Sequence, residues 1–197
     1  MSILSFHATK VFNTIEGGAI ICKDEATKKR IDYLKNFGFA GETKVIAPGI
    51  NAKMNELQAA YGILQLKSID GAIEKRRKVA SLYRDLLRGI MGVHILNDLE
   101  DIKHNYAYFP IFVDVKEYGK SRDALYEELK KHNIFARRYF YPLISQFPTY
   151  SGLPSASAGN LPVAEDFTKK VICLPIYPDL TVNDVNSICL LIKLFKS

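Results

Sequence analysis

The chain has 197 residues, of which 48% are hydrophobic and 24% are charged, and its net charge is +6. This composition is typical of a globular protein and excludes a disordered or fibrous chain. The longest apolar runs are far too short to span a bilayer, and the first residues lack the basic region and cleavage site of a signal peptide. The three cysteines are widely spaced in apolar runs, which favours buried thiols in a reducing compartment and therefore a cytoplasmic location: Cys22, Cys173 and Cys189.

The first 69 residues predict two strands followed by two helices. Apolar runs on either side of Glu16-Gly17-Gly18 predict a pair of strands, the second over residues 19–22. Asp24 is a typical N-cap for a helix that reaches about residue 36, and Gly38 is a typical stop signal. A second helix is predicted from Asn55, and four residues recur on one face of it: Leu57, Ala60, Tyr61 and Leu64.

The remaining residues predict a denser alternation of helices and strands. Thr181 and Asp184 form a variant of the capping box at the start of the last helix. The expected helices cover residues 72–87, 121–133 and 181 onward; the expected strands cover 93–96, 107–113, 135–141 and 171–174; a Ser-, Pro- and Gly-rich loop is expected over 145–162.

These elements predict two regions of different character. Residues 70–197 have enough strands and helices for a small α/β domain with its own core. Residues 1–69 offer a strand pair and helices, which make a poor core by themselves. We therefore interpret residues 1–69 as the C-terminal remnant of a larger sheet domain, followed by a small α/β domain over residues 70–197.

Lys10 is the first candidate for chemistry. It lies between the apolar residues Phe6 and Val11-Phe12, beside the Glu-Gly-Gly turn. Most lysines lie on the surface, so the residue by itself carries no functional meaning. A lysine amine that is held in place and neutral can attack an aldehyde to form a Schiff base, which makes Lys10 a candidate nucleophile.

Four motifs, in the same order along essentially the whole chain, resemble the DegT/DnrJ/StrS family of aminotransferases. The first contains Lys10 and continues into the glycine turn. The second resembles the family segment Gly-x-Asn-x-Arg-Met-(Ser/Asn)-(Glu/Asp)-x-Gln-Ala-Ala. The four are Ser5-Phe6-His7-Ala8-Thr9-Lys10 with Ile15-Glu16-Gly17-Gly18-Ala19, then Gly49 to Ala60, then Arg138-Tyr139-Phe140-Tyr141-Pro142-Leu143, then Leu174-Pro175-Ile176-Tyr177-Pro178.

The resemblance implies a fold and a cofactor. Family members are fold-type I transferases that use pyridoxal 5'-phosphate (PLP) to place amino groups on keto-sugars, usually nucleotide-linked. Lys10 matches the lysine that binds PLP covalently, and Ser5 matches the serine that donates to the PLP phosphate. Asn51 matches an asparagine that reaches the phosphate site of the neighbouring subunit of a homodimer. Lys53 stands where the family often has arginine.

The implied function is PLP-dependent transfer of an amino group, from an amino acid such as glutamate, to a keto-sugar in surface polysaccharide or amino-sugar biosynthesis. Only nine residues precede Lys10, whereas the family's acidic partner of the PLP ring precedes its lysine by a long stretch. The sequence therefore resembles the C-terminal half of a family member, and we expect the chain alone to bind PLP poorly and to be inactive. No metal site is expected, because the histidines are scattered.

Three alternatives remain open from the sequence. A PLP-dependent sugar dehydratase is disfavoured by Lys10, since those relatives typically carry histidine there. A regulatory module that binds nucleic acid or another polyanion is permitted by the charge of +6. The longest basic cluster, Lys75-Arg76-Arg77-Lys78, is more typical of a solvated helix face, and no membrane or nucleic-acid partner is expected. A remnant that pairs with a chain carrying the first half is the third alternative.

Overall fold

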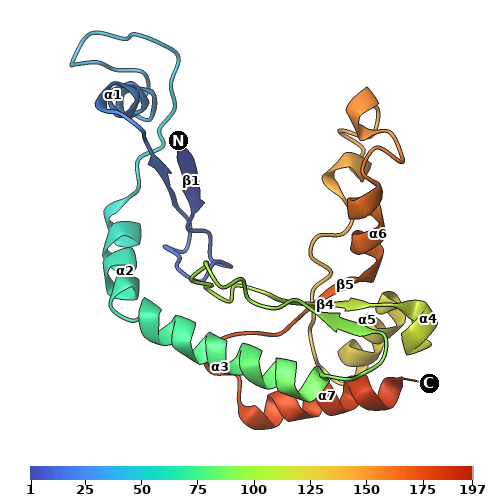
Figure 1. Cartoon of the computed structure of the whole chain (residues 1–197). Coiled ribbons are helices and arrows are strands. Elements are labelled where there is room, and N and C mark those ends of the chain that lie inside the picture. The colour runs from blue at the N-terminus through green and yellow to red at the C-terminus, as the bar shows by residue number, and fades with distance from the viewer. Residues whose placement is uncertain (197) are drawn as a thin grey trace. The chain divides into compact units, whose positions relative to one another are not determined.

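The computed structural model describes residues 1–196 and divides into two units, Met1–Gly71 and Ala72–Ser197 (Figure 1). Each unit is described by itself. Both contain helices and an antiparallel sheet, as the sequence predicts for an α/β chain.

The first unit holds the predicted strand pair and helices. Strand β1 (Ser2–Ser5) pairs antiparallel with β2 (Gly18–Ile21), so that the residues on either side of the connecting loop, Ser5 and Gly18, lie opposite each other. Helix α1 (Glu25–Leu34) begins after Asp24, whose carboxylate accepts a hydrogen bond from the Thr27 amide at 2.7 Å. These elements confirm the predicted strands and the predicted helix cap.

Helix α2 (Glu56–Leu66) follows the second motif. Its N-cap is Asn55, whose side chain accepts from the Gln58 amide at 2.9 Å. The spacing of the repeated residues correctly predicts a helix. Within the first unit, however, Leu57 is 84% exposed and Leu64 is 61% exposed.

The second unit is built on a three-stranded antiparallel sheet in the order β3-β4-β5. In the central strand β4, residue Ile111 lies opposite Ile95 of β3 and Ile172 of β5. The strands are β3 (Val93–Ile95), β4 (Phe109–Val113) and β5 (Val171–Leu174), and the helices are α3 (Ile69–Leu87), which starts before the boundary between the units, α4 (Val115–Tyr118), α5 (Arg122–Lys131), α6 (Pro162–Lys170) and α7 (Val182–Phe195).

The core of the second unit lies between this sheet and helices α3, α5 and α7. Tyr83 of α3 stacks on Phe109 of β4 with ring centroids 4.9 Å apart, and its hydroxyl donates to the Pro175 carbonyl at 3.0 Å. The buried face of α7 matches the expected stripe, since Val185, Ile188, Cys189 and Ile192 are all buried. The predicted capping box is also present, because Thr181 and Asp184 bond to each other's backbone amides at 3.1 and 3.2 Å.

Two stretches of the second unit differ from the sequence prediction. Residues 135–141 were expected to form a strand, but only Arg137 pairs with β5, through two backbone hydrogen bonds to Cys173. Beyond it, the Tyr139 and Phe140 rings stack on each other and contact the Tyr108 ring edge to face. No element was predicted for residues 163–170, where α6 forms after Pro162 at its N-terminus.

Candidate functional site

The loop between β1 and β2 carries Lys10. The loop is closed at its base by two backbone hydrogen bonds, from the Phe6 amide to the Gly17 carbonyl and from the Thr14 amide to the Phe6 carbonyl, both 2.9 Å. Within it the Lys10 amide donates to the His7 carbonyl at 2.9 Å, which makes a tight turn. Lys10 is half-buried at this turn. The loop is thus a defined structure that holds one lysine at a fixed place.

Helix α2 supports this loop through a glycine. A Cβ atom on Gly62 would lie 2.8 Å from Thr14 Cγ2 and 3.8 Å from Phe12 Cζ, so the absence of a side chain lets the loop approach the helix. Phe12 packs edge to face on Phe6, with ring centroids 4.9 Å apart. Thr14 is buried, and its hydroxyl donates to the Glu16 carbonyl at 2.8 Å. The apolar side of the loop is therefore fixed against α2.

The polar side of the loop links Ser5 to Lys10 through His7. The His7 amide donates to Ser5 Oγ at 3.4 Å, while the His7 carbonyl accepts from the Lys10 amide. His7 Nδ1 lies 2.6 Å from Glu16 Oε1 across the loop. Lys10 forms no ion pair with any carboxylate of residues 1–196. Its amine and the Ser5 hydroxyl proton both remain available to a ligand.

Asn51 lies in a separate segment, which is fastened to the end of α1. Asn51 forms an isolated bridge with Asn36, and the neighbouring Ile50 and Ala52 amides donate to the Leu34 and Lys35 carbonyls, both at 2.9 Å. The side chain of Asn51 is exposed. No contact between described residues joins it to Ser5 or Lys10. The structure therefore brings two of the three predicted site residues onto one hairpin, Ser5 at the end of β1 and Lys10 in the loop, and leaves the third elsewhere.

Lys53 lies beside this segment. Its Nζ atom donates to Asn36 Oδ1 at 2.9 Å and lies 4.7 Å from the centroid of the Phe37 ring. Lys53 thus already has partners within the chain, unlike Lys10.

Lys10 and Ser5 fit two of the polar ends of PLP. A free amine is the group that bonds to an aldehyde, and a short hydroxyl is a suitable donor to a phosphate. The backbone of His7 fixes the two residues relative to each other, as a ligand contacted at both ends requires. A third requirement, a carboxylate for the pyridine nitrogen, is not met on this loop, because its carboxylate, Glu16, is engaged by His7.

The third motif forms an anchored segment in the second unit. Two guanidinium groups lie near the Tyr141 ring, with Arg122 Cζ at 5.0 Å and Arg138 Cζ at 5.6 Å from its centroid. Arg138 Nη1 bonds to Asp123 Oδ1 at 2.8 Å, and Arg122 Nη1 donates to the Val171 carbonyl at 2.7 Å. These contacts hold the motif against α5 and β5.

Arg122 was not singled out from the sequence. It is 2% exposed, and burial lowers the pKa of its guanidinium, although the nearby Asp123 carboxylate acts in the opposite sense. An arginine in the first turn of a helix is ordinarily exposed, so no local signal could have identified it. Ile144, which replaces the family's histidine after the Pro-Leu pair, is 67% exposed.

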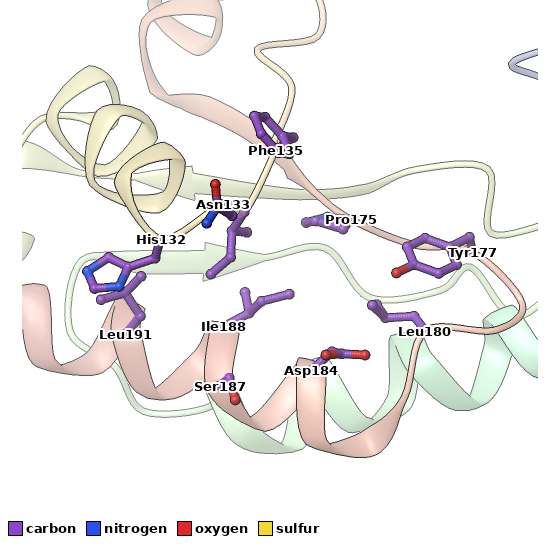
Figure 2. A pocket seen from close by; sticks show the side chains of 11 residues that line it. His132, Asn133, Phe135, Pro175, Tyr177, Leu180, Asp184, Ser187, Ile188 and Leu191 are labelled. Carbon is purple, nitrogen blue, oxygen red and sulfur yellow. The ribbon is translucent and has the colours of Figure 1, made fainter.

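A groove of about 530 Å³ lies in the second unit between the end of α5 and helix α7 (Figure 2). Leu180 and Ile188 form its buried floor. His132 stands at one side, with Nε2 3.4 Å from Glu128, and Asp184 on the rim already caps α7. The groove contains none of Ser5, Lys10 and Asn51.

The described residues contain no cluster of side chains suited to a metal ion, and none of their helices is long and apolar enough to cross a membrane. All three cysteines are free thiols. Burial raises the pKa of Cys173 to about 11 and that of Cys189 to about 12, so these two thiols are unreactive at neutral pH.

Comparisons with known proteins match this arrangement over most of the chain. The model of the DegT/DnrJ/EryC1/StrS aminotransferase family matches residues 1–193. A dTDP-4-amino-4,6-dideoxy-D-glucose transaminase of Escherichia coli is 56% identical over 165 residues, which are 84% of this chain and 44% of that protein. The protein of the same description from Shigella dysenteriae is 44% identical, over 92% of this chain and 48% of that protein.

A solved structure agrees in fold. The crystal structure of DesI in the presence of its TDP-sugar product superposes with a TM-score of 0.89 at 32% identity, over 98% of this chain and 48% of that chain. The chain therefore spans about half the length of the relatives it matches, and its α/β architecture is that of part of a fold-type I transferase. The Lys10 loop and the fold both agree with the family match. The chain therefore belongs to the DegT/DnrJ/EryC1/StrS aminotransferase family.

Proposed function

We propose that this chain provides the PLP-binding lysine of a sugar aminotransferase. The observation that carries the proposal is the β1–β2 hairpin, which carries Ser5 at the end of β1 and Lys10 in its loop. Among residues 1–196, the Lys10 amine and the Ser5 hydroxyl proton have no hydrogen-bond or ion-pair partner. The family match over residues 1–193 supports the same role.

Bound PLP supplies an electron sink, which stabilises negative charge at the carbon next to the reacting nitrogen. Lys10 would hold PLP through Nζ, and Ser5 would donate its hydroxyl proton to the phosphate. The Lys10 amine, when not bonded to the cofactor, would move a proton at the reacting carbon as a general acid and base. His7 and Glu16 fix the turn between the two residues.

The acceptor that we propose is a dTDP-linked 4-keto-6-deoxy sugar, and the amino donor is glutamate. The relatives with 56% and 44% identity are dTDP-4-amino-4,6-dideoxy-D-glucose transaminases, which supports the sugar and its nucleotide. The product then enters surface polysaccharide biosynthesis in the cytoplasm. Glutamate follows from the family resemblance.

The working enzyme is proposed to be a homodimer in which Asn51 reaches the phosphate site of the second subunit. In the described part of the chain, residues 1–196, Asn51 is exposed and no bond joins it to Ser5 or Lys10, as such a role requires. The adjoining face of α2 exposes apolar side chains, of which Leu57 is 84% and Leu64 is 61% exposed. An apolar face of this kind is suited to an isologous contact with a second copy.

A polyanion-binding module is less well supported. In the basic cluster, Lys75 bonds to Asp179 at 3.1 Å and Arg77 pairs with Glu74 at 2.7 Å. Arg76 is directed inward, where Nη1 donates to the Tyr106 and Ile176 carbonyls at 3.2 and 2.8 Å. Charged side chains that already have partners within the chain provide a weak site for phosphates. The sequence suggested that the whole cluster lies on a solvated helix face, but Arg76 does not.

The test is an amino-transfer assay on a fusion in which the first half of the E. coli relative directly precedes this chain. We expect the fusion to transfer nitrogen from glutamate to the dTDP-4-keto-6-deoxy sugar, and Lys10→Ala to lower the rate by at least about 1,000-fold, because both cofactor attachment and proton transfer are lost. Lys44→Ala, at an exposed lysine of the same unit, is the matched control. Equal rates for Lys10→Ala and Lys44→Ala would refute the proposal.

We expect the chain alone, without the first half, to bind PLP poorly and to be inactive, because the carboxylate for the pyridine nitrogen is not on the Lys10 loop. A stoichiometric PLP absorbance band in the isolated chain, abolished by Lys10→Ala, would contradict this expectation.

A further inference from the structure

The backbone of Lys10 is held on both sides. Its amide donates to the His7 carbonyl at 2.9 Å, and its carbonyl accepts a hydrogen bond from Asn13 Nδ2 at 3.4 Å. The first bond closes the turn before Lys10, and the second ties Lys10 to the residues that return toward β2. Because both backbone polar groups of Lys10 have partners, the loop defines the point from which its side chain extends.

The Asn13 side chain joins two points of the loop. While Nδ2 donates to the Lys10 carbonyl, Oδ1 accepts from the Ile15 amide at 3.2 Å. A carboxamide can donate and accept at the same time, which an ionised carboxylate of the same shape cannot do. Asn13 is half-buried, and its side chain connects the Lys10 turn to the residues just before Glu16-Gly17-Gly18.

Ile15 is held in an unfavourable backbone conformation. Its φ is 68°, and the Glu16 amide donates to the Thr14 carbonyl at 2.8 Å, so residues 14–16 form the rare γ-turn with positive φ at its centre. Such a φ is strained for any side chain and most of all for a β-branched one. The Ile15 side chain is 57% exposed, so packing within the first unit does not account for this conformation. The hydrogen bond to Asn13 helps to hold it.

The strained turn leads into the other link to Lys10. Glu16 follows Ile15, and its Oε1 atom lies 2.6 Å from His7 Nδ1. The His7 carbonyl in turn accepts from the Lys10 amide. These contacts form a closed ring within the loop, whose members are Lys10, Asn13, Ile15, Glu16 and His7. Backbone strain that surrounding contacts maintain is typical of functional sites, where it keeps a group in place.

We propose that Asn13 is a positioning residue for Lys10, and that it uses the strained turn at Ile15 to fix the backbone from which the amine reaches the aldehyde of PLP. A side chain that is placed before binding loses less conformational freedom on binding, so the benefit is a higher affinity for PLP. The inference rests on the proposed function, because a fixed Lys10 backbone favours PLP only if the Lys10 amine holds it.

The experiment measures PLP affinity of the fusion by absorbance titration and locates the cofactor by borohydride reduction and peptide mass spectrometry. We expect Asn13→Ala to weaken PLP binding about fivefold, as the loss of a side-chain hydrogen bond typically does, with the pyridoxyl group still on Lys10. Asn160→Ala is the matched control, because Asn160 Nδ2 also donates to a loop carbonyl, that of Pro154, at 3.0 Å, but belongs to the second unit. It should bind PLP as wild type does.

A second substitution separates positioning from a general loss of structure. Glycine adopts a positive φ without steric cost, so Ile15→Gly should restore the turn in the absence of the Asn13 side chain. We expect Asn13→Ala combined with Ile15→Gly to bind PLP within about twofold of wild type. Asn13→Ala combined with Ile15→Val keeps a β-branched residue in the turn, and we expect it to stay about fivefold weaker.

A measurement on the unsubstituted fusion tests the same link should Asn13→Ala fail to fold. The Ile15 amide donates to Asn13, so it should exchange with solvent at least about tenfold more slowly than an unbonded exposed amide. Exchange at the rate of an unbonded amide would overturn the proposal. So would PLP affinity of Asn13→Ala equal to that of Asn160→Ala, or equal weakness of the two double variants.

The outcomes also separate this inference from the proposed function. An unsubstituted fusion that is folded but carries no pyridoxyl group on Lys10 contradicts the proposed function. A fusion that carries the group on Lys10, and binds PLP equally well after Asn13→Ala, supports the proposed function and contradicts only the role of Asn13.

Discussion

Single charged side chains connect segments that are distant in the sequence of the second unit. Arg84 of α3 forms two hydrogen bonds to the Asp98 carboxylate, and the Tyr106 hydroxyl donates to the same group at 2.9 Å. Partial burial alone would raise the pKa of Asp98, but the donors outweigh it and the pKa lies below its ordinary value. The carboxylate thus contributes to stability in its ionised form.

The first prediction concerns this carboxylate. Because its pKa is lowered on folding, its contribution is present above the unfolded pKa, about 3.9, and is lost as the pH falls through the folded value. We expect Asp98→Asn to lower the free energy of unfolding by about 1 kcal/mol at pH 7, and the difference from wild type to shrink below about pH 4. Urea unfolding between pH 3 and pH 7 measures both.

Asp179→Asn is the matched control for that experiment. Asp179 also pairs with a cation, Lys75, but its side chain is 84% exposed, so the pair is screened by solvent. We expect this variant to stay close to wild type across the range. A difference between Asp98→Asn and wild type that grows as the pH falls would show that the sign of the pKa shift is wrong.

At the scale of elements, helix α2 positions the Lys10 loop because Gly62 of the helix has no side chain and lets the loop approach closely. Thr14 is buried against Gly62, and its hydroxyl is already bonded to the Glu16 carbonyl, so it has little freedom to move away. The helix and the loop therefore form one structural element of the candidate site.

The second prediction sets helix propensity against this packing. Replacement of a glycine by alanine within a helix is expected to raise the free energy of unfolding by up to about 1 kcal/mol. At Gly71, where a Cβ meets no atom within 4 Å, we expect Gly71→Ala to be neutral or stabilising. At Gly62 the new Cβ meets Thr14, and we expect Gly62→Ala in the fusion to weaken PLP binding about tenfold, through overpacking of about 1–3 kcal/mol. Equal PLP affinity for the two variants would exclude the proposed role of Gly62.

The elements that the sequence predicted correctly are those with local signals. Asp24, Asn55 and Thr181 each cap a helix through their own side chain, so the start of the helix is encoded within a few residues. The glycines at 17 and 18 correctly mark the start of β2, although the connection between the two strands spans residues 6–17 and is longer than the predicted turn. Ser5 and Lys10 could be placed on one hairpin because they are near neighbours in the sequence.

The features that the sequence did not predict depend on distant contacts. Residues 135–141 have the composition of a strand, but Tyr108, Asp123 and Arg122 hold the end of this stretch in another conformation. The exposed face of α2 has the spacing of a core stripe, and spacing cannot reveal whether the covering surface belongs to the same chain. Residue roles at the site came from the family resemblance, not from local chemistry.

At the scale of the whole molecule, the two units differ in how much apolar surface they bury. The second unit packs α3, α5 and α7 around its sheet, whereas the first has no buried aliphatic side chain among residues 1–71. Local opening of a region costs free energy in proportion to such packing. The candidate site therefore lies on the part of the chain that contributes least to its own stability.

The third prediction follows from this contrast. In the isolated chain, we expect the amides of β1 and β2 to exchange with solvent at least about 100-fold faster than those of β4 and β5. Hydrogen exchange followed by mass spectrometry measures this ratio. Similar protection in the two sheets would mean that the first unit is stable by itself.

The central claim is that Lys10 binds PLP. The most direct measurement is borohydride reduction of the fusion after incubation with PLP, followed by mass spectrometry of its peptides. Reduction fixes the cofactor on the lysine that holds it. The account predicts one pyridoxyl group per chain, on the peptide that contains Lys10. A pyridoxyl group on another lysine, or a fusion that is folded and carries none, would contradict it.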